Sequence, residues 1–353
     1  MTDTRKPSLA GLVPAHPREV AFGIAAAFGM GVILACQSRI NGELGQRLDD
    51  GVLAALWSFG SGWVVLLILM ALLPGVRRGV RQLLSTVRLP SLRGDSALDR
   101  DAGTASRPAY RLRWWQCLGG VCGAYLVVVQ STTVGLVGVA VFTVAVVAGQ
   151  AATSLVVDRL GLGPAGRTLV TRNRVLGASL ALGAVALAVS DEVRTPALLL
   201  LAVAPALAGV GTAWQQAVNG RVSATATVDG NGVTGALVAA LINFTVGTAA
   251  LGIAAGVDII LRGLPSEWPA APQLYLGGLC GVAFITGAAF IVRFTGVLLL
   301  GLGAVAGQLV GALVLDGLIP AGDAHLTTVT LIGTLLTLVA VMIAALPTRS
   351  VRP

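Results

Sequence analysis

The side chains of this sequence that could do chemistry are amides set inside long apolar runs. Gln37 is followed four residues later by Asn41-Gly42, and the same arrangement recurs at Gln215 and Asn219-Gly220. Polar groups in such runs are costly unless they face a cavity or a partner helix. Both pairs are therefore candidates for lining a site that binds a polar solute.

Four further polar residues occupy matching positions. Ser58 lies in "SFGSG" and Asn243 in "NFTVG", while Gln150 and Gln308 each follow a glycine, about two helical turns inside an apolar run. In a transporter the four glutamines should surround one central cavity, and hydrogen bonding between helices is an equally good interpretation of them. The candidate substrate-binding residues are Gln37, Gln150, Gln215, Gln308, Ser58 and Asn243.

The candidate gating or coupling residues are Asp158, Asp316, Asn41 and Asn219. Each aspartate ends an apolar run, where a carboxylate opposes the helix dipole unless it is paired. An anchor paired with a nearby Arg is the favoured interpretation, and a gate ion pair or proton acceptor is the alternative. Each asparagine precedes a glycine, which favours a helix C-cap over a gating role. No apolar run holds an acid near its middle, which argues against proton-coupled export.

Membrane-spanning helices must position these residues. The chain is 55% hydrophobic and 11% charged, with a mean hydropathy of +0.85, unlike ordinary soluble domains. Ten runs are long enough to cross a hydrocarbon core of about 30 Å, and none contains a charged residue or His. The sequence predicts an all-α polytopic membrane protein with spans near 20–38, 52–73, 114–134, 136–157, 175–190, 197–218, 232–257, 273–292, 294–315 and 326–346.

Arginine and lysine set the expected orientation. The segment from about residue 76 to 113 holds nine Arg against three Asp, so it should be a cytoplasmic loop. Alternating the spans then puts 20 of the 24 basic residues in the cytoplasm, with both termini inside. This explains the net charge of +8 without nucleic acid. The loop could also contact anionic lipid headgroups, although a topology signal is the favoured interpretation.

Short motifs occur twice along the chain. "LGGVCG" at 118–123 matches "LGGLCG" at 276–281, and "GQAATSLVVD" at 149–158 matches "GQLVGALVLD" at 307–316, both at an offset of 158. With alternating spans the two copies have opposite orientations in the membrane. The sequence therefore predicts two inverted five-helix repeats, at 20–190 and 197–346, between a cytoplasmic segment 1–19 and a cytoplasmic tail 347–353.

In these motifs the chain resembles the drug/metabolite transporter superfamily, whose members are often built from two inverted five-helix halves. The Gln-x-x-x-Asn-Gly pattern, the Gly-Gly-x-x-Gly opening of the third helix of each half, and Gly-Gln followed by Asp are similar to the YdcZ-like family of inner-membrane exporters. The resemblance covers the chain except residues 1–18 and about 76–113. It implies a fused, duplicated exporter in the bacterial inner membrane and does not name a substrate.

Three classes of function are compatible with a polytopic membrane chain. A secondary transporter, an exporter of a small metabolite or drug, is favoured because inverted repeats provide alternating access. A membrane regulator or accessory subunit that transports nothing is the alternative. An enzyme is disfavoured because no helix carries a metal set or an activated nucleophile. We expect no cofactor and no metal, since Cys117 and Cys122 lack further ligands at metal spacing. The expected partners are a small-molecule substrate and the lipid bilayer, with the chain a monomer or homodimer.

Overall fold

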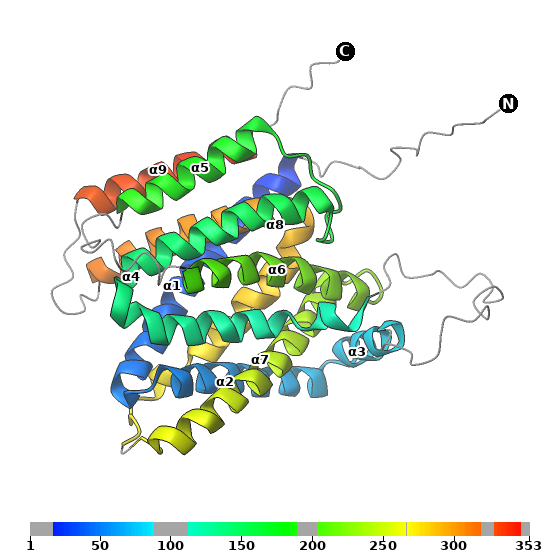
Figure 1. The fold of residues 1–353 in the computed structure, drawn as a ribbon. Helices are drawn as coiled ribbons and strands as arrows, with labels where there is room; N and C mark the ends of the chain where they lie inside the picture. Colours follow the sequence, from blue (N-terminus) through cyan, green and yellow to red (C-terminus); the bar gives the residue numbers. More distant parts are fainter. Residues whose placement is uncertain (1–16, 88–111, 189–202, 266, 319–327, 347–353) are drawn as a thin grey trace, which may run out of the picture.

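The described part of the chain is all-helical and contains no β-strand, as predicted. The computed structural model describes residues 17–87, 112–188, 203–265, 267–318 and 328–346, without the side chains of 131–144, 316–317 and 329–330. In chain order the elements are α1 (Pro17–Leu48), α2 (Gly51–Leu72), α3 (Pro74–Thr86), η2 (Trp114–Cys117), α4 (Gly119–Leu160), α5 (Arg172–Ala188), α6 (Val203–Ala226), α7 (Gly232–Arg262), η5 (Pro272–Tyr275), α8 (Gly277–Leu318) and α9 (Thr328–Ala345) (Figure 1).

Helix α4 unites the predicted third and fourth spans and folds back on itself. Gly119, at its start, lies against Asn219 near the end of α6. Gly161, just after its other end, accepts a hydrogen bond from Arg221, two residues further along α6. Because both ends of α4 lie at the same end of α6, α4 consists of two legs (Figure 1).

Helix α8 unites the predicted eighth and ninth spans in the same way. Its two legs meet at Gly296, where φ is 72° and ψ is 177°, a conformation that is essentially restricted to glycine. Gly277 in the first leg lies against Asn41 of α1, and Gly311 in the second leg lies against Ala35 of the same helix. The backbone therefore reverses at Gly296, which lies inside the predicted ninth span and not between the two spans.

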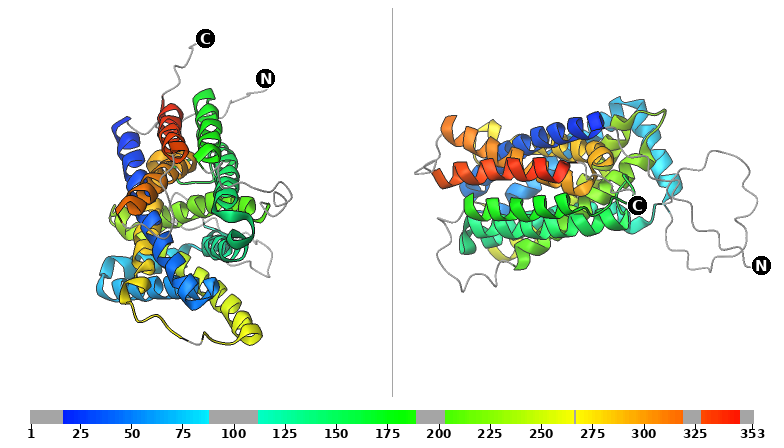
Figure 2. Two further views of the ribbon diagram at one scale, coloured as in Figure 1. Left: turned by 90° about the vertical axis from the view of Figure 1, so that its left-hand side faces the viewer. Right: turned by 90° about the horizontal axis from the view of Figure 1, so that it is seen from above.

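The legs pack closely against two long helices. A Cβ at Gly31 of α1 would collide with the backbone at Ala304 in the second leg of α8, and a Cβ at Gly209 of α6 would collide with the backbone at Val146 in the second leg of α4. Glycine is required at both crossings because it lets helix backbones approach. Helices α5 and α9 form a further pair at one edge of the molecule (Figure 2).

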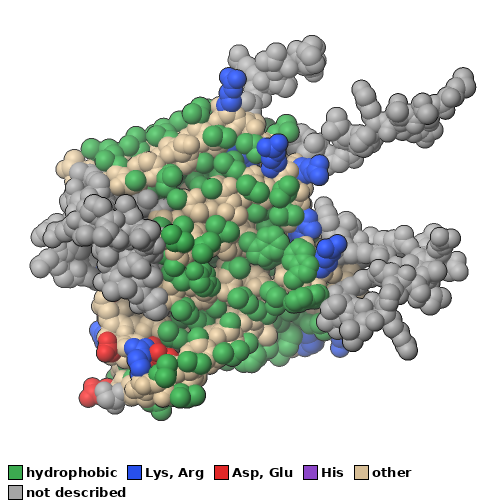
Figure 3. Space-filling view, in the orientation of Figure 1, with side chains coloured by type: hydrophobic (Ala, Val, Ile, Leu, Met, Phe, Trp, Pro, Cys, Tyr) green, Lys and Arg blue, Asp and Glu red, His purple; other side chains and the backbone are tan. Residues whose placement is uncertain are grey.

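The surface is arranged as expected for a membrane protein. Among the described residues, α1, α2, α7 and the segment Pro272–Leu315 are long and apolar enough to cross a membrane. Hydrophobic side chains cover the middle of the face in Figure 3, and arginine side chains gather at its right-hand edge. In Figures 1 and 2 α1 begins and α9 ends at that same edge.

Two local predictions are wrong. Helix α1 continues to Leu48 and α6 to Ala226, so Asn41 and Asn219 lie inside helices and are not C-caps. Their contacts with other helices replace the cap that the following glycine suggests. The start of the predicted loop at 76–113 is also helical, because α3 buries an apolar stripe on the bundle. Residues 88–111 of that loop, 1–16 and 347–353 lie outside the described residues.

Candidate functional site

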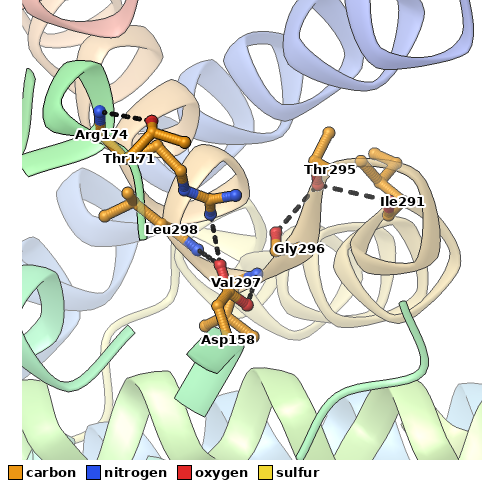
Figure 4. Close-up of polar contacts among 8 residues, drawn as sticks. All are labelled: Asp158, Thr171, Arg174, Ile291, Thr295, Gly296, Val297 and Leu298. Atoms are coloured by element: carbon orange, nitrogen blue, oxygen red, sulfur yellow. Dashed lines mark hydrogen bonds and ion pairs between the residues drawn. The ribbon is translucent and has the colours of Figure 1, made fainter. Parts of the chain in front are cut away.

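Asp158, near the end of α4, caps a helix from the other half of the chain. Its carboxylate accepts hydrogen bonds from the backbone N–H groups of Val297, at 2.8 Å, and Leu298, at 3.2 Å, the first residues after the break at Gly296 (Figure 4). The positive end of a helix dipole stabilises a carboxylate. The N-terminus of the second leg of α8 therefore stabilises the Asp158 carboxylate, whereas the C-terminus of α4 would destabilise it.

Arg174 of α5 pairs with the same carboxylate. Its guanidinium donates a hydrogen bond to Asp158, and the two side chains are only 8% and 4% exposed, respectively. Thr171 Oγ1 accepts a hydrogen bond from the backbone N–H of Arg174 at 3.3 Å, which fixes the first turn of α5. We call Asp158, Arg174 and residues 296–298 the Asp158 junction. It ties α4, α5 and α8 together at one end of the bundle.

The candidate amides of α6 and α7 form a buried cluster. Asn243 Oδ1 accepts hydrogen bonds from Gln215 Nε2, at 2.9 Å, and from Asn219 Nδ2, at 3.1 Å. The cluster packs against Gly119 and Gly123, at the start of α4. Three of the predicted site residues are therefore brought together here, at a crossing of three helices.

The candidate residues of α1 and α2 form a sparser version of the same cluster. Asn41 Nδ2 donates a hydrogen bond to Ser58 Oγ at 3.2 Å. Asn41 lies against Gly277 and Gln37 against Gly281, at the start of α8. Ser58 is buried, whereas Gln37 and Asn41 are half-buried. The same helix crossing thus occurs twice, with Ser58 in the place that Asn243 occupies in the other half.

Gln150 faces a different space. A small cavity between the second legs of α4 and α8 is lined by Val147, Gln150, Ala151, Ser154, Leu298, Gly301, Leu302 and Val305. Ser154 is 1% exposed, and its hydroxyl has no hydrogen-bond partner in the described structure. Gln150, Ser154 and Asp158 are spaced by four residues, so they lie on one face of α4. A polar row therefore runs from the cavity to the Asp158 junction.

Gln308 and Asp316 lie in the second leg of α8. The backbone of Gln308 approaches Gly31 of α1, and its side chain is half-buried. The side chain of Asp316 lies outside the described residues. At the offset of 158 that relates the repeats, Ala312 stands where Ser154 stands in α4, so the polar row is not repeated in full.

The expectation that four glutamines surround one cavity does not describe this conformation. Of the four, only Gln150 lines the cavity, and Gln215 is hydrogen-bonded to Asn243. The structure adds Ser154 and Arg174, which no sequence motif indicated. The spacing of Ser154 between Gln150 and Asp158 on a helical face could have identified the first of them.

A second aspartate caps a helix at the opposite end of the bundle. Asp50 accepts hydrogen bonds from the N–H groups of Val52, at 2.9 Å, and Leu53, at 3.0 Å, in the first turn of α2. Arg262 lies 3.6 Å from its carboxylate. Burial raises the pKa of Asp50, its bonds to backbone N–H groups lower it, and the carboxylate of Asp258 raises it further. We call this segment the Asp50 turn.

Comparison with known proteins agrees with this helical arrangement. The model of the family described as "Putative inner membrane exporter, YdcZ" matches residues 22–94, 96–187 and 200–343. The first two segments cover the first half of the chain and the third covers the second half. No curated protein matches the sequence.

A solved structure shares the fold. A protein whose structure is titled only "Crystal structure of protein" superposes with a TM-score of 0.60 at 19% sequence identity. The match covers 93% of this chain and 96% of the other, so the likeness extends over the whole helical bundle.

Proposed function

The chain belongs to the YdcZ family of inner membrane exporters, and on this premise we propose that it is a secondary transporter that exports a small metabolite or drug by alternating access. The observation that carries the proposal is the polar row of Gln150, Ser154 and Asp158. It joins a cavity between two legs to a buried ion pair at the end of the bundle. The row would provide hydrogen bonds for a polar solute in an otherwise apolar passage.

Matching contacts in the two halves support an inverted repeat. Asn219 of α6 lies against Gly119 of α4. In the same way, Asn41 of α1 lies against Gly277 of α8. Phe59 and Phe244, the second residues of the two matching motifs, pack on each other with ring centroids 5.1 Å apart. Equivalent residues that touch must lie close to the axis that relates the halves. Exchanging the conformations of such halves would turn a cavity from one side of the membrane to the other.

The cavity in this structure suits a closed state. Its volume is about 10 Å³, which is about the space of one water molecule and far below the range of roughly 300–1,000 Å³ that small-molecule sites occupy. The legs of α4 and α8 must separate before a metabolite can enter. Because Asp158 holds both Arg174 and the start of the second leg of α8, we propose that the Asp158 junction is the gate at this end of the bundle. We propose the same gating or coupling role for the other three candidates, Asp316, Asn41 and Asn219.

The end that carries the gate is assigned to the cytoplasm. Among the described residues it includes Arg77, Arg78 and Arg81 of α3, Arg159 and Arg174, whereas the opposite end includes Arg39, Arg47 and Arg262. The positive-inside rule then puts both termini in the cytoplasm. In a cysteine-free background, an impermeant thiol reagent should label Gln46→Cys in intact cells and Ser85→Cys only after lysis. Labelling of Ser85→Cys in intact cells would reverse the orientation.

The function itself is tested by untargeted comparison of metabolites in cells and medium. Cells that overexpress the protein should lose a small set of metabolites to the medium, and Gln150→Leu should abolish this loss. Gln46→Leu makes the same chemical change at an exposed site outside the cavity and is the matched control. We expect Gln308→Leu to act as Gln150→Leu does. Melting temperatures should stay close to wild type, because in the described structure neither glutamine side chain makes a hydrogen bond whose partner would be left unpaired.

One observation favours a second candidate, a membrane regulator or accessory subunit. Gln215, Asn219 and Asn243 are engaged with one another, as expected of polar groups that only join helices. A regulator would leave the metabolite pattern of overexpressing cells equal to that of the empty vector. Loss of folded protein in proportion to activity in Gln150→Leu would likewise make the amides structural and remove the site assignment.

A further inference from the structure

We propose that α3 binds the headgroup of an anionic phospholipid through Arg77 and Arg81. These residues form one stripe with Leu73 and Leu84, which we call the α3 stripe. Helix α3 lies at the edge of the bundle where the arginine side chains gather (Figures 1 and 3). The proposal concerns the membrane around the protein and does not depend on what the protein transports.

The opposite face of α3 is fixed on the bundle. Val76 and Leu83 are 2% and 1% exposed and belong to a core shared with α6 and α7. Gly79 allows close approach to Ala226, the last residue of α6. Gln82 Nε2 donates a hydrogen bond to the carbonyl oxygen of Thr225 at 2.7 Å. Helix α3 therefore cannot turn about its axis, and its outward face is set by the fold.

The outward face alternates charge with apolar surface. Positions 73, 77, 81 and 84 are spaced by four, four and three residues, which places them on one side of a helix. Arg77 and Arg81 are exposed, Leu84 is 67% exposed and Leu73 is 39% exposed. In the part of the chain that the structure describes, neither arginine pairs with a carboxylate, and Arg77 donates one hydrogen bond to the carbonyl oxygen of Ala71 in α2. Two cations are thus held beside apolar side chains.

Arg78 marks the edge of the stripe. It projects from another side of α3 and pairs with Asp229, in the turn between α6 and α7, at 2.7 Å. That ion pair is complete within the protein. Within the described residues Arg78 therefore has a counter-charge, whereas Arg77 and Arg81 have none and can bind an anionic ligand.

Continuity with the lipid-facing surface identifies the ligand. Val64, Ile68 and Leu72 of α2 are 50%, 52% and 69% exposed and follow one another at four-residue spacing. In a membrane protein such a face contacts acyl chains, and it leads directly into the α3 stripe. A phospholipid has the complementary arrangement, with a phosphate above acyl chains. Guanidinium groups bind phosphate oxygens through parallel hydrogen bonds, and basic residues at the cytoplasmic interface attract anionic lipids.

The test is native mass spectrometry of the purified full chain with added dioleoyl phosphatidylglycerol or dioleoyl phosphatidylcholine. The wild-type protein should retain phosphatidylglycerol in preference to phosphatidylcholine. Arg77→Gln with Arg81→Gln should reduce that preference about thirtyfold, from the typical contribution of each basic residue near an anionic surface. Replacing both arginines by lysine should preserve most of it, because the charge remains.

The matched control is Arg159→Gln with Arg172→Gln. It removes two exposed charges from the same edge of the molecule, outside α3. This control should keep the wild-type preference. Equal loss in both double variants, or no loss in the α3 variant, would overturn the proposal. Displacement of bound phosphatidylglycerol by millimolar inorganic phosphate would also overturn it, because the site would then recognise a phosphate and not a lipid.

Discussion

The Asp158 junction and the Asp50 turn use the same chemistry to different ends. Each aspartate accepts hydrogen bonds from two backbone N–H groups at the start of a helix, and each has an arginine beside it. Asp50 caps its own helix, two and three residues away, and the side chain of Arg262 is 56% exposed. Asp158 caps a helix 139 and 140 residues away, and Arg174 is buried. The same cap is local at one end of the bundle and joins the two halves at the other.

The largest difference should appear when the buried arginine is removed. Arg174→Gln leaves the carboxylate of Asp158 buried without its counter-charge, and this should cost about 3–5 kcal/mol of unfolding free energy. Unfolding by SDS in mixed micelles measures it. The double variant Asp158→Asn with Arg174→Gln should recover part of the loss, because no buried charge remains. A cost below about 1 kcal/mol for Arg174→Gln would mean that the junction is open to water.

Exchanging each aspartate for asparagine tests the two caps directly. Asn231 already caps α7 by accepting hydrogen bonds from the N–H groups of Val233 and Thr234, so Asp50→Asn should cost less than about 0.5 kcal/mol. Asp158→Asn should cost about 2–3 kcal/mol, because Arg174 loses its partner. The same SDS titration measures both. Equal costs at the two sites would contradict the distinction drawn here.

Removing the exposed arginine should have a small effect. Arg262→Gln breaks the contact with Asp50 and the ion pair with Asp258, but solvent screens both interactions at an exposed side chain. We expect a loss below about 1 kcal/mol, and raised salt should reduce it further. A loss as large as that of Arg174→Gln would show that the Asp50 turn is buried against a partner or lipid.

The smallest effect should be the pH dependence that Asp50 contributes to stability. The folded protein holds the pKa of Asp50 above the unfolded value of about 3.9. The stability that this group contributes is therefore full below that value and is lost as pH rises through the raised pKa. The melting temperature of wild type relative to Asp50→Asn should fall across this window. A relative melting temperature that rises with pH would mean that Arg262 outweighs burial.

The sequence was sufficient to predict an all-helical fold and to indicate which polar residues need partners. It did not identify those partners. It showed that Asp158 needs a favourable environment. It could not show that Arg174 pairs with Asp158 or that the cap belongs to residues 297 and 298, because both contacts depend on how legs fold back. Gly296 was hidden in an apolar run whose composition does not change at the break. Helix α3 was missed because its many arginines outweighed the spacing of Val76 and Leu83.

The long sequence separation at the Asp158 junction has a consequence for biogenesis. Chains are synthesised from the N-terminus, so α4 and α5 leave the ribosome before Val297 and Leu298 exist. During that interval Asp158 lacks the two backbone donors that the finished protein gives it. Closure of this end of the bundle is therefore a late step of assembly. A nascent chain that stops before α8 retains an uncapped carboxylate, a feature by which quality control could distinguish an unfinished molecule from a complete one.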